Sequence, residues 1–403
     1  MKKRTLSVLV VLSMVISMLG TALPAQAYAP PTPTAWTFMV YMAADNNLND
    51  AAIVDLNEME MAPSSDQVNV IALMDLYGPA NTTAYRITHD TNPDAIASTV
   101  FTPPGGWSWA TEANVGDPAT LTEFVTKTAM AYPAQHYAVV LWNHGSGIRA
   151  LTMSEPEYKY IALDETSSNS YIDIPELAGA LDLVNTQIGG PLGVVAFDAC
   201  LMQMAEIAHQ LIGNTQMLVG SEEVVPGDGF PYDAILGDLA LNPMMSCRQL
   251  SEAIVGRYAE EYAANEVYGN FTMSALDLLG MFSPGMGPIS ADISALGDAM
   301  ATSGEWDSIF AARLTAESFN DADYIDLKDF AQRVNTMVTN PAVKAAAATL
   351  INDLGLTVFA KANGPKHPDA GGLSIYMPIA GEIDSVYSQV QFVTDTTWDE
   401  FLT

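Results

Sequence analysis

The sequence predicts an α/β fold with a mostly parallel sheet that helices cover on both faces. Short apolar runs rich in β-branched and aromatic residues alternate with helical patterns along the chain, and this alternation is typical of parallel sheets. The chain has 403 residues, of which 49% are hydrophobic and 15% charged. This composition excludes a disordered protein and allows one large domain or two smaller ones.

The predicted elements can be assigned in order along the chain. Central strands are expected at 36–42, 68–73, 137–142, 193–197 and 217–220, and edge strands at 83–89 and 98–102. Helices are expected up to about residue 61, where Asp45, Asn46 and Asn47 offer N-caps, and at 121–132, at 175–183 and up to 211. Residues from about 245 to 360 are expected to be predominantly helical, with a strand returning at 373–377.

The first 27 residues have the features of an export signal. A positive start at Lys2, Lys3 and Arg4 precedes an apolar run from Leu6 to Leu23 and a small-x-small cleavage pattern at 25–27. The alternative is an uncleaved anchor, because the run nearly reaches the length of a bilayer span. We expect cleavage, hence a secreted protein with no stable membrane partner. A Pro-rich leader at 28–35, an α/β core at 36–240 and a largely helical C-terminal region at 241–403 would follow.

The charge balance narrows the possible partners. Acidic residues number 47 against 15 basic ones, which gives a formal net charge of −32. Such a chain repels phosphate backbones, so nucleic-acid binding is not expected. A basic substrate would be attracted to it.

Two predicted strands end in reactive side chains. The strand at 137–142 leads into His144 and Gly145, and the strand at 193–197 leads into Asp198 and Cys200. Ligand sites in α/β sheets form at the carboxyl ends of strands, where an imidazole can serve a thiolate nucleophile. A histidine roughly 50 residues ahead of the cysteine is also the caspase arrangement. The alternative is a buried structural cysteine and a structural histidine.

The other histidines and the second cysteine fit this chemistry less well. His89 lies in a polar edge segment, His136 precedes a strand, His209 lies on the helix after Cys200, and His367 lies in a loop. The second cysteine, Cys247, could form a disulfide with Cys200 in an exported protein. Such a disulfide would remove the nucleophile.

These motifs, together with several others, resemble clostripain-like cysteine peptidases, which are relatives of caspases, gingipains and legumains. The matching stretches are WTFMVYMAADNNLND (36–50), LWNHGSG (141–147), FDACLMQMAEIA (197–208), PGDGFPYD (226–233), YIDLKDFA (324–331) and GLSIYMP (372–378). They span nearly the whole mature chain in the family's order. The resemblance implies a caspase-like α/β fold.

The resemblance also implies roles for individual residues. His144 and Cys200 would form a catalytic dyad that acts through a thioester, with the backbone N–H groups of Gly145 and Cys200 as the oxyanion hole. Asp198 and Asp228 would line a pocket for Arg or Lys, because unpaired buried carboxylates reject neutral side chains. The alternatives are a strand-end cap for Asp198 and a turn residue for Asp228.

Many relatives are zymogens that cut themselves, and this chain has a long polar segment between His144 and Cys200. Arg149 and Lys159 are the basic residues within 149–170, so they are the candidate self-processing sites. The alternative is an exposed loop that stays intact.

The sequence requires no metal or cofactor. It has no HExxH motif and no Cys/His spacing typical of zinc sites. Calcium is possible by the resemblance, since the family's namesake depends on it. The run Asp45–Asp50 does not form an EF-hand, because Asp50 and Leu56 stand where Gly and Glu belong. A second acidic group is expected to form a solvated helix start: Asp321, Asp323, Asp326 and Asp329.

We therefore expect a secreted cysteine endopeptidase that cuts proteins or peptides after Arg or Lys. The alternatives are a non-catalytic caspase-like binding module and a structural surface protein.

Overall fold

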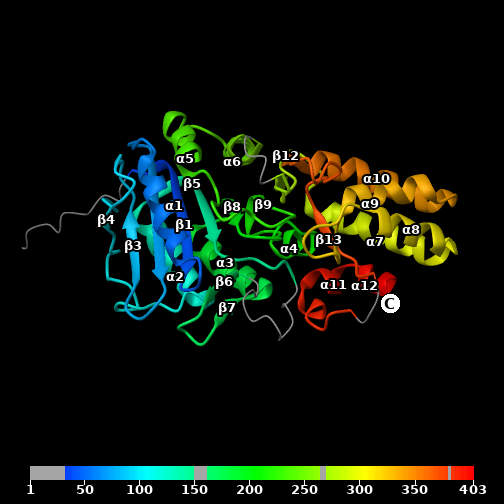
Figure 1. Ribbon diagram of the computed structural model, residues 1–403, viewed down its shortest axis with the longest axis horizontal. Helices are drawn as coiled ribbons and strands as arrows, with labels where there is room; N and C mark the ends of the chain where they lie inside the picture. Colours follow the sequence, from blue (N-terminus) through cyan, green and yellow to red (C-terminus); the bar gives the residue numbers. More distant parts are fainter. Residues whose placement is uncertain (1–31, 149–160, 264–268, 380–382) are drawn as a thin grey trace, which may run out of the picture. The chain divides into compact units, whose positions relative to one another are not determined.

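A nine-stranded sheet in the order β12-β10-β9-β8-β5-β1-β2-β3-β4 organises the computed structural model (Figure 1). The structure describes residues 32–148, 161–263, 269–379 and 383–403. The five central strands, β2, β1, β5, β8 and β9, are parallel, and the strands added at both edges are antiparallel. This confirms the predicted mostly parallel sheet.

The sheet strands are β1 (Thr34–Ala44), β2 (Val68–Leu76), β3 (Thr82–Arg86), β4 (Thr99–Val100), β5 (Ala134–Trp142), β8 (Leu192–Asp198), β9 (Thr215–Gly220), β10 (Thr272–Asp277) and β12 (Val358–Asn363). Two small antiparallel pairs are β6 (Ile161–Asp164) with β7 (Ser170–Ile172), and β11 (Tyr324–Asp326) with β13 (Ser374–Tyr376). The helices are α1 (Asn49–Met61), α2 (Pro118–Ala131), α3 (Ile174–Ile188), α4 (Ala205–Gln210), α5 (Tyr232–Leu241), α6 (Cys247–Ala263), α7 (Met286–Ser303), α8 (Trp306–Thr315), α9 (Leu327–Met337), α10 (Pro341–Thr357), α11 (Gln391–Asp395) and α12 (Trp398–Leu402). None of the helices in these described parts is long and apolar enough to span a membrane.

Helices cover both faces of the sheet because side chains of a strand alternate between its faces. In β1, Phe38, Val40 and Met42 belong to one apolar core, which also contains buried residues of α1, α5 and α6. Met39 and Tyr41 belong to the other core, which contains buried residues of α2, α3 and α4 and of the C-terminal helices α7, α9 and α10. The central strands are therefore buried on both sides.

The sequence explains where several helices begin and end. Asp173 and Glu176 form a reciprocal capping box at the start of α3, and the left-handed Gly189 ends the helix. Asp117 caps α2 by accepting a hydrogen bond from the backbone N–H of Ala119.

The predicted caps of α1 are wrong. The N-cap position is Leu48, and no side chain caps the helix. Asp45 is instead buried and accepts a hydrogen bond from Thr166, and Asn47 contacts His144. These residues serve the loops around the site rather than the helix.

The C-terminal region has more strand than the sequence predicts. β10 and β12 both lie in the main sheet, with β10 between β9 and β12. The helices α7 to α10 and the returning strand β13 agree with expectation. A domain boundary at residue 240 stays a prediction, and the export signal at 1–27 lies outside the described residues.

The expected solvated helix start is wrong for two of its acids. Asp326 and Asp329 are buried, and Asp326 caps α9 by accepting from the Asp329 N–H. Asp326 also accepts a hydrogen bond from the backbone of Gly371. It therefore ties the start of α9 to the chain just before β13.

Candidate active site

His144 and Cys200 lie at the same edge of the sheet because β5 and β8 are parallel neighbours. Trp142 and Asp198, the last residues of the two strands, are opposite each other in the register. Each candidate catalytic residue follows two positions later, and both line one cavity of about 490 Å³. The other lining residues are Gly145, Ser146, Leu201, Val224 and the loop 320–322.

Gly145 is the point of contact between the two loops. A Cβ atom at this position would overlap the carbonyl oxygen of Cys200 and would lie 3.0 Å from its backbone nitrogen. Only glycine lets the backbones approach this closely. The two backbone N–H groups expected to form the oxyanion hole therefore lie in one corner of the cavity.

Cys200 sits half-buried in a tight turn. The backbone N–H of Val225 donates to its Sγ at 3.2 Å. Burial raises the pKa of the thiol to about 11, against the smaller opposing effect of that hydrogen bond. The next residue, Leu201, has a φ of 63°, a left-handed conformation that is strained for a residue with a side chain. The turn is thus held in place by its surroundings.

His144 is held by a residue that the sequence analysis missed. Its Nε2 lies 2.6 Å from Oδ1 of Asn47. With this oxygen as acceptor, Nε2 carries the proton and Nδ1 is the basic nitrogen. Burial lowers the pKa of His144 to about 4, so the ring is neutral at pH 7.

Asp198 lines a smaller hollow of about 160 Å³ beside Cys200. Its Oδ2 accepts hydrogen bonds from the Phe230 N–H at 3.0 Å and from the Tyr232 hydroxyl at 2.9 Å. Burial raises the pKa of Asp198 to about 6. The carboxylate is therefore fixed in place and ionised above that pH.

Asp228 lines a neighbouring hollow of about 430 Å³, and Gly227 lines both hollows. Three further acids line the second hollow: Asp55, Glu58 and Asp233. Burial, followed by the charge of Asp198, raises the pKa of Asp55 to about 9, against a 2.6 Å hydrogen bond from Trp142 Nε1. The structure thus brings Asp198 and Asp228 into one acidic region, which also contains acids of α1.

Asp55 was also missed by the sequence analysis, although a signal for it exists. It lies on the helix face of Ala52, Leu56 and Met59, all of which are buried. An acidic residue within the apolar stripe of a helix becomes buried, which costs free energy unless another group compensates its charge. This position could have marked Asp55 as a candidate.

A second histidine–cysteine pair lies near the opposite end of β5. His136 Nδ1 is 3.5 Å from Cys247 Sγ, and His136 precedes the end of the strand at Trp142 by roughly 20 Å. Burial raises the pKa of the Cys247 thiol to about 11. A Cβ on Gly193 would lie only 2.7 Å from its sulfur, so the thiol is closely packed. Both cysteines are free thiols, and the possible disulfide between them is not formed.

The remaining histidines do not line the cavity that contains His144 and Cys200. His89 contacts the carbonyls of Glu60 and Ala62, His209 contacts Ser290 and Asp395, and His367 contacts Glu223 and Glu317. The candidate self-processing residues Arg149 and Lys159 lie outside the described residues.

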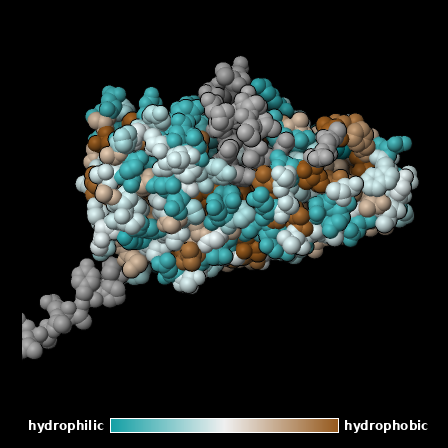
Figure 2. Space-filling view, turned by 90° about the horizontal axis from the view of Figure 1, so that it is seen from below, coloured by the Kyte–Doolittle hydropathy of each residue, from teal (hydrophilic) through white to brown (hydrophobic). Residues whose placement is uncertain are grey.

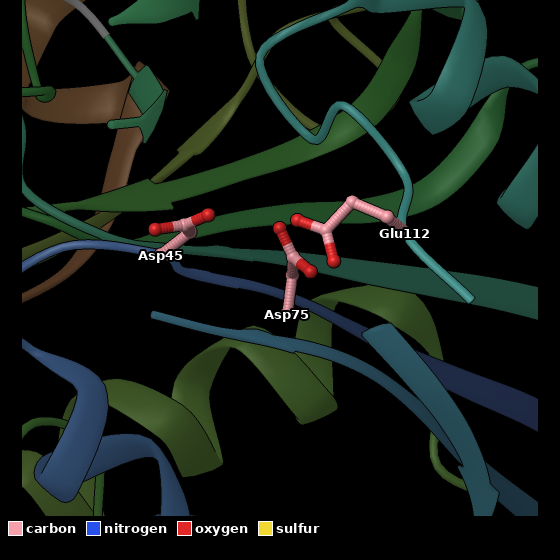
Figure 3. Close-up of side chains that lie close together, drawn as sticks. All are labelled: Asp45, Asp75 and Glu112. Carbon is pink, nitrogen blue, oxygen red and sulfur yellow. The ribbon is translucent and has the colours of Figure 1, made fainter. Parts of the chain in front are cut away.

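Among the residues that the structure describes, one group of side chains could hold a metal ion. Asp45, Asp75 and Glu112 each offer a carboxylate oxygen, and these oxygens lie within 4.8 Å of one another (Figure 3). The group lies at the carboxyl ends of β1 and β2, next to the loop that carries Asn47.

Comparison with known proteins gives matches over most of the chain. A family model described as the clostripain family matches residues 40–403. Clostripain from Hathewaya histolytica is 32% identical over 220 residues, which cover 49% of this chain and 41% of that protein. The chain thus aligns with less than half the length of this curated relative.

Two solved structures share the fold. A secreted C11 cysteine protease from Bacteroides thetaiotaomicron, in complex with an irreversible peptide inhibitor, has a TM-score of 0.67 at 21% identity. The similarity covers 91% of this chain and 100% of that chain. An inactive zymogen C11 protease from Parabacteroides distasonis has the same TM-score and identity, over 91% and 99%. These likenesses confirm the predicted fold class.

Proposed function

The chain belongs to the clostripain family, and from this premise we propose that it is a secreted cysteine endopeptidase that cleaves after Arg or Lys. The observation that carries the proposal is the meeting of His144, Gly145 and Cys200 in one cavity. The acidic region around Asp198 begins beside that cavity, because Cys200 lines both hollows.

The proposed reaction follows from the chemistry of these groups. Cys200 Sγ attacks the scissile carbonyl carbon while its proton passes to His144, and the N–H groups of Gly145 and Cys200 stabilise the oxyanion. His144 then protonates the leaving amine, and a thioester forms. His144 next takes a proton from water, which hydrolyses the thioester and restores the thiol. The thiol and the imidazole are both neutral at pH 7. The proton of Cys200 therefore passes to His144 at the moment when the sulfur attacks the substrate.

Access favours His144 and Cys200 over His136 and Cys247. A nucleophile must reach a carbonyl carbon, and Cys200 lines a cavity large enough for a peptide segment. Cys247 is 5% exposed, and His136 packs on Trp36 with ring centroids 4.9 Å apart. The second pair is best explained as part of the core.

The acidic region supports the preference for basic substrates. A guanidinium or ammonium in this region would meet Asp198 directly and would lie near Asp228 and Asp55. Ion pairs that are shielded from water discriminate strongly against neutral side chains.

Secretion and self-processing are supported by sequence and by relatives. Residues 1–27 have the pattern of an export signal, one structural neighbour is a secreted protease, and another is a zymogen. We propose cleavage after Lys159 or Arg149 as the processing event.

The first experiment measures turnover of matched fluorogenic peptides that end in Arg, Lys, Asp or Leu, under reducing conditions. The enzymes are wild type, Cys200→Ala, His144→Ala, Cys247→Ala and His136→Ala. We expect Cys200→Ala and His144→Ala to abolish cleavage after Arg and Lys, and the other two variants to remain active.

The paired design separates the possible outcomes. Loss of activity in Cys247→Ala with activity retained in Cys200→Ala would assign catalysis to the other pair. Cleavage only after Asp or Leu would keep the dyad but contradict the basic preference. No cleavage by processed wild type would favour a binding module.

A further inference from the structure

The carboxylates of Asp45, Asp75 and Glu112 converge from three segments of the chain. Asp45 follows β1, Asp75 lies in β2, and Glu112 lies between β4 and α2. Figure 3 shows the three carboxylates facing one another, and one oxygen of each lies within 4.8 Å of the others. Oxygens at metal–ligand distances of 2.3–2.6 Å from a Ca²⁺ ion can be this far apart. The spacing is therefore compatible with a calcium-sized cation.

Two buried oxygens of this group have no hydrogen-bond partner among the described residues. Thr166 donates to Asp45 Oδ2, and Thr82 donates to Asp75 Oδ1 at 2.5 Å. The second oxygens, Asp45 Oδ1 and Asp75 Oδ2, receive no such bond, although both side chains are 0% exposed. Buried carboxylate oxygens left this way are costly. Each of the two acids thus has one oxygen fixed by a threonine and one available to a ligand.

The charges around the group are also negative. The charges of Asp164 and Glu112 both act on Asp45 and on Asp75. Asp164 is itself buried, and its oxygens accept hydrogen bonds from the backbone N–H groups of Val115 and Ser167. Four carboxyl groups thus gather here, and a divalent cation would compensate their charge.

The group is connected to the catalytic histidine. Asn47, two residues after Asp45, contacts His144 Nε2. Between them, Asn46 donates to the carbonyls of Ala43 and Leu163 at 3.0 Å, which ties the loop to β1 and β6. A cation bound to Asp45 would fix this short loop at its start.

We propose that Asp45, Asp75 and Glu112 bind one hard divalent cation of the size of Ca²⁺, and that this cation holds the 45–47 loop so that Asn47 orients His144. The binding site depends only on the three acids, whereas its effect on His144 rests on the proposed catalytic dyad. We expect Mg²⁺ to bind more weakly than Ca²⁺ at this site, because Mg²⁺ demands shorter metal–oxygen distances and gives up its bound waters reluctantly. Asn47 is a positioning residue in this scheme.

Binding is tested first, without reference to catalysis. The full chain with Cys200→Ala, which prevents self-cleavage, is treated with a chelator and then titrated with CaCl₂ or MgCl₂ by calorimetry and thermal unfolding. We expect one Ca²⁺ site and a Ca²⁺-dependent rise in unfolding temperature. Asp75→Asn and Glu112→Gln should weaken Ca²⁺ binding by more than about tenfold, since even residues behind metal ligands contribute about 10–100-fold.

Asp50→Asn is the matched control, because Asp50 is an exposed acid of the same run and lies at the start of α1. It should leave Ca²⁺ affinity unchanged. A Ca²⁺ effect that disappears in Asp50→Asn, or that survives in Asp75→Asn and Glu112→Gln, would overturn the site. So would the absence of any Ca²⁺-dependent shift.

The link to His144 is tested by kinetics on the chain with Cys200 intact. Ca²⁺ should raise kcat with little change in KM, and Asn47→Ala should lose this stimulation while still binding Ca²⁺ in the calorimeter. Normal binding with no effect on kcat in an active enzyme would overturn the link. If no peptide is cleaved at all, the binding data still decide the site, so the two proposals fail separately.

Discussion

Gly145 has a hydrogen atom in place of a side chain, and this allows the His144 loop to approach the backbone of Cys200. A methyl group here would push the His144 loop away from Cys200, since the obstructing atoms belong to the backbone. We expect Gly145→Ala to lower kcat by at least about 100-fold, because displacements of about 1 Å at a reacting centre have such effects. Steady-state kinetics would check this. Gly179→Ala, on α3 with nothing within 4 Å of the added carbon, should retain full activity.

Asp198 should give the enzyme a pH dependence that only basic substrates report. Its raised pKa of about 6 means that the carboxylate ionises as the pH rises through 6. We therefore expect kcat/KM for an Arg peptide to rise through that range, well above the pKa of His144. A citrulline peptide, which has the same shape without the charge, should lack this rise.

The same residue gives a mutational check. Asp198→Asn should lower kcat/KM for the Arg peptide by at least about 30-fold, the equivalent of 2 kcal/mol, and should remove the rise near pH 6. An unchanged Arg profile would assign the specificity to other acids of the region, such as Asp228.

The site residues differ in how far the sequence could predict them. His144, Gly145 and Cys200 follow apolar strands directly, so strand ends and glycines locate them. Asn47 could not be found in this way, because an Asn before a helix is equally typical of an N-cap. Its role depends on the distance to His144, which only the packing of β1 beside β5 creates.

At the scale of elements, α3 allows a direct test of a helix cap that the structure shows. Asp173→Ala removes the hydrogen bond that the Asp173 side chain accepts from the Glu176 N–H, and should lower the free energy of unfolding by about 1 kcal/mol. Urea unfolding measures this change. Asp307→Ala, in the first turn of α8, where no side chain caps the helix, should have an effect below about 0.5 kcal/mol. Equal effects would contradict the capping role of Asp173.

Strand prediction succeeded in the centre of the sheet and failed at one edge. The central strands are long apolar runs buried on both faces, and such runs are recognisable locally. β12 is only partly buried, and β10 pairs with it in antiparallel orientation across helices α7 to α10. Because that pairing joins segments far apart in the chain, no local pattern reveals it.

For the molecule as a whole, buried carboxyls make stability depend on pH. Burial raises the pKa of Asp45 to about 6 and that of Asp75 to about 8. A carboxyl with a raised folded pKa contributes stability below its unfolded pKa, near 4, and loses it as the pH rises through the folded value. The cation-free protein should therefore lose stability between about pH 4 and 8, by up to about 1.4 kcal/mol per pH unit for each titrating group.

Urea unfolding at several pH values, with chelator or with excess Ca²⁺, measures this slope. Ca²⁺ should flatten it, because the bound cation favours the ionised carboxylates, and Asp75→Asn should reduce it in the chelated protein. Asp55 contributes with the same sign through its pKa of about 9, so some slope should persist in the variant. Stability that rises with pH under chelation would contradict this account.

Figure 2 shows a face on which hydrophilic residues predominate and hydrophobic ones are scattered. With a net charge of −32, the protein attracts basic peptides over distances that salt shortens.

The segment that follows Cys200 is held by hydrogen bonds from residues near the C-terminal end of the sequence. The backbone N–H of Ser374 donates to the Gln203 carbonyl at 3.0 Å, and that of Tyr376 donates to the buried carboxyl of Glu206. Trp398 in turn donates to the carbonyl of Tyr376. The first two of these bonds join the segment just after Cys200 to a segment that lies about 170 residues further along the chain. The segment that carries the candidate nucleophile is therefore completed by contacts that close very long loops of the chain, and we expect these contacts to form late in folding.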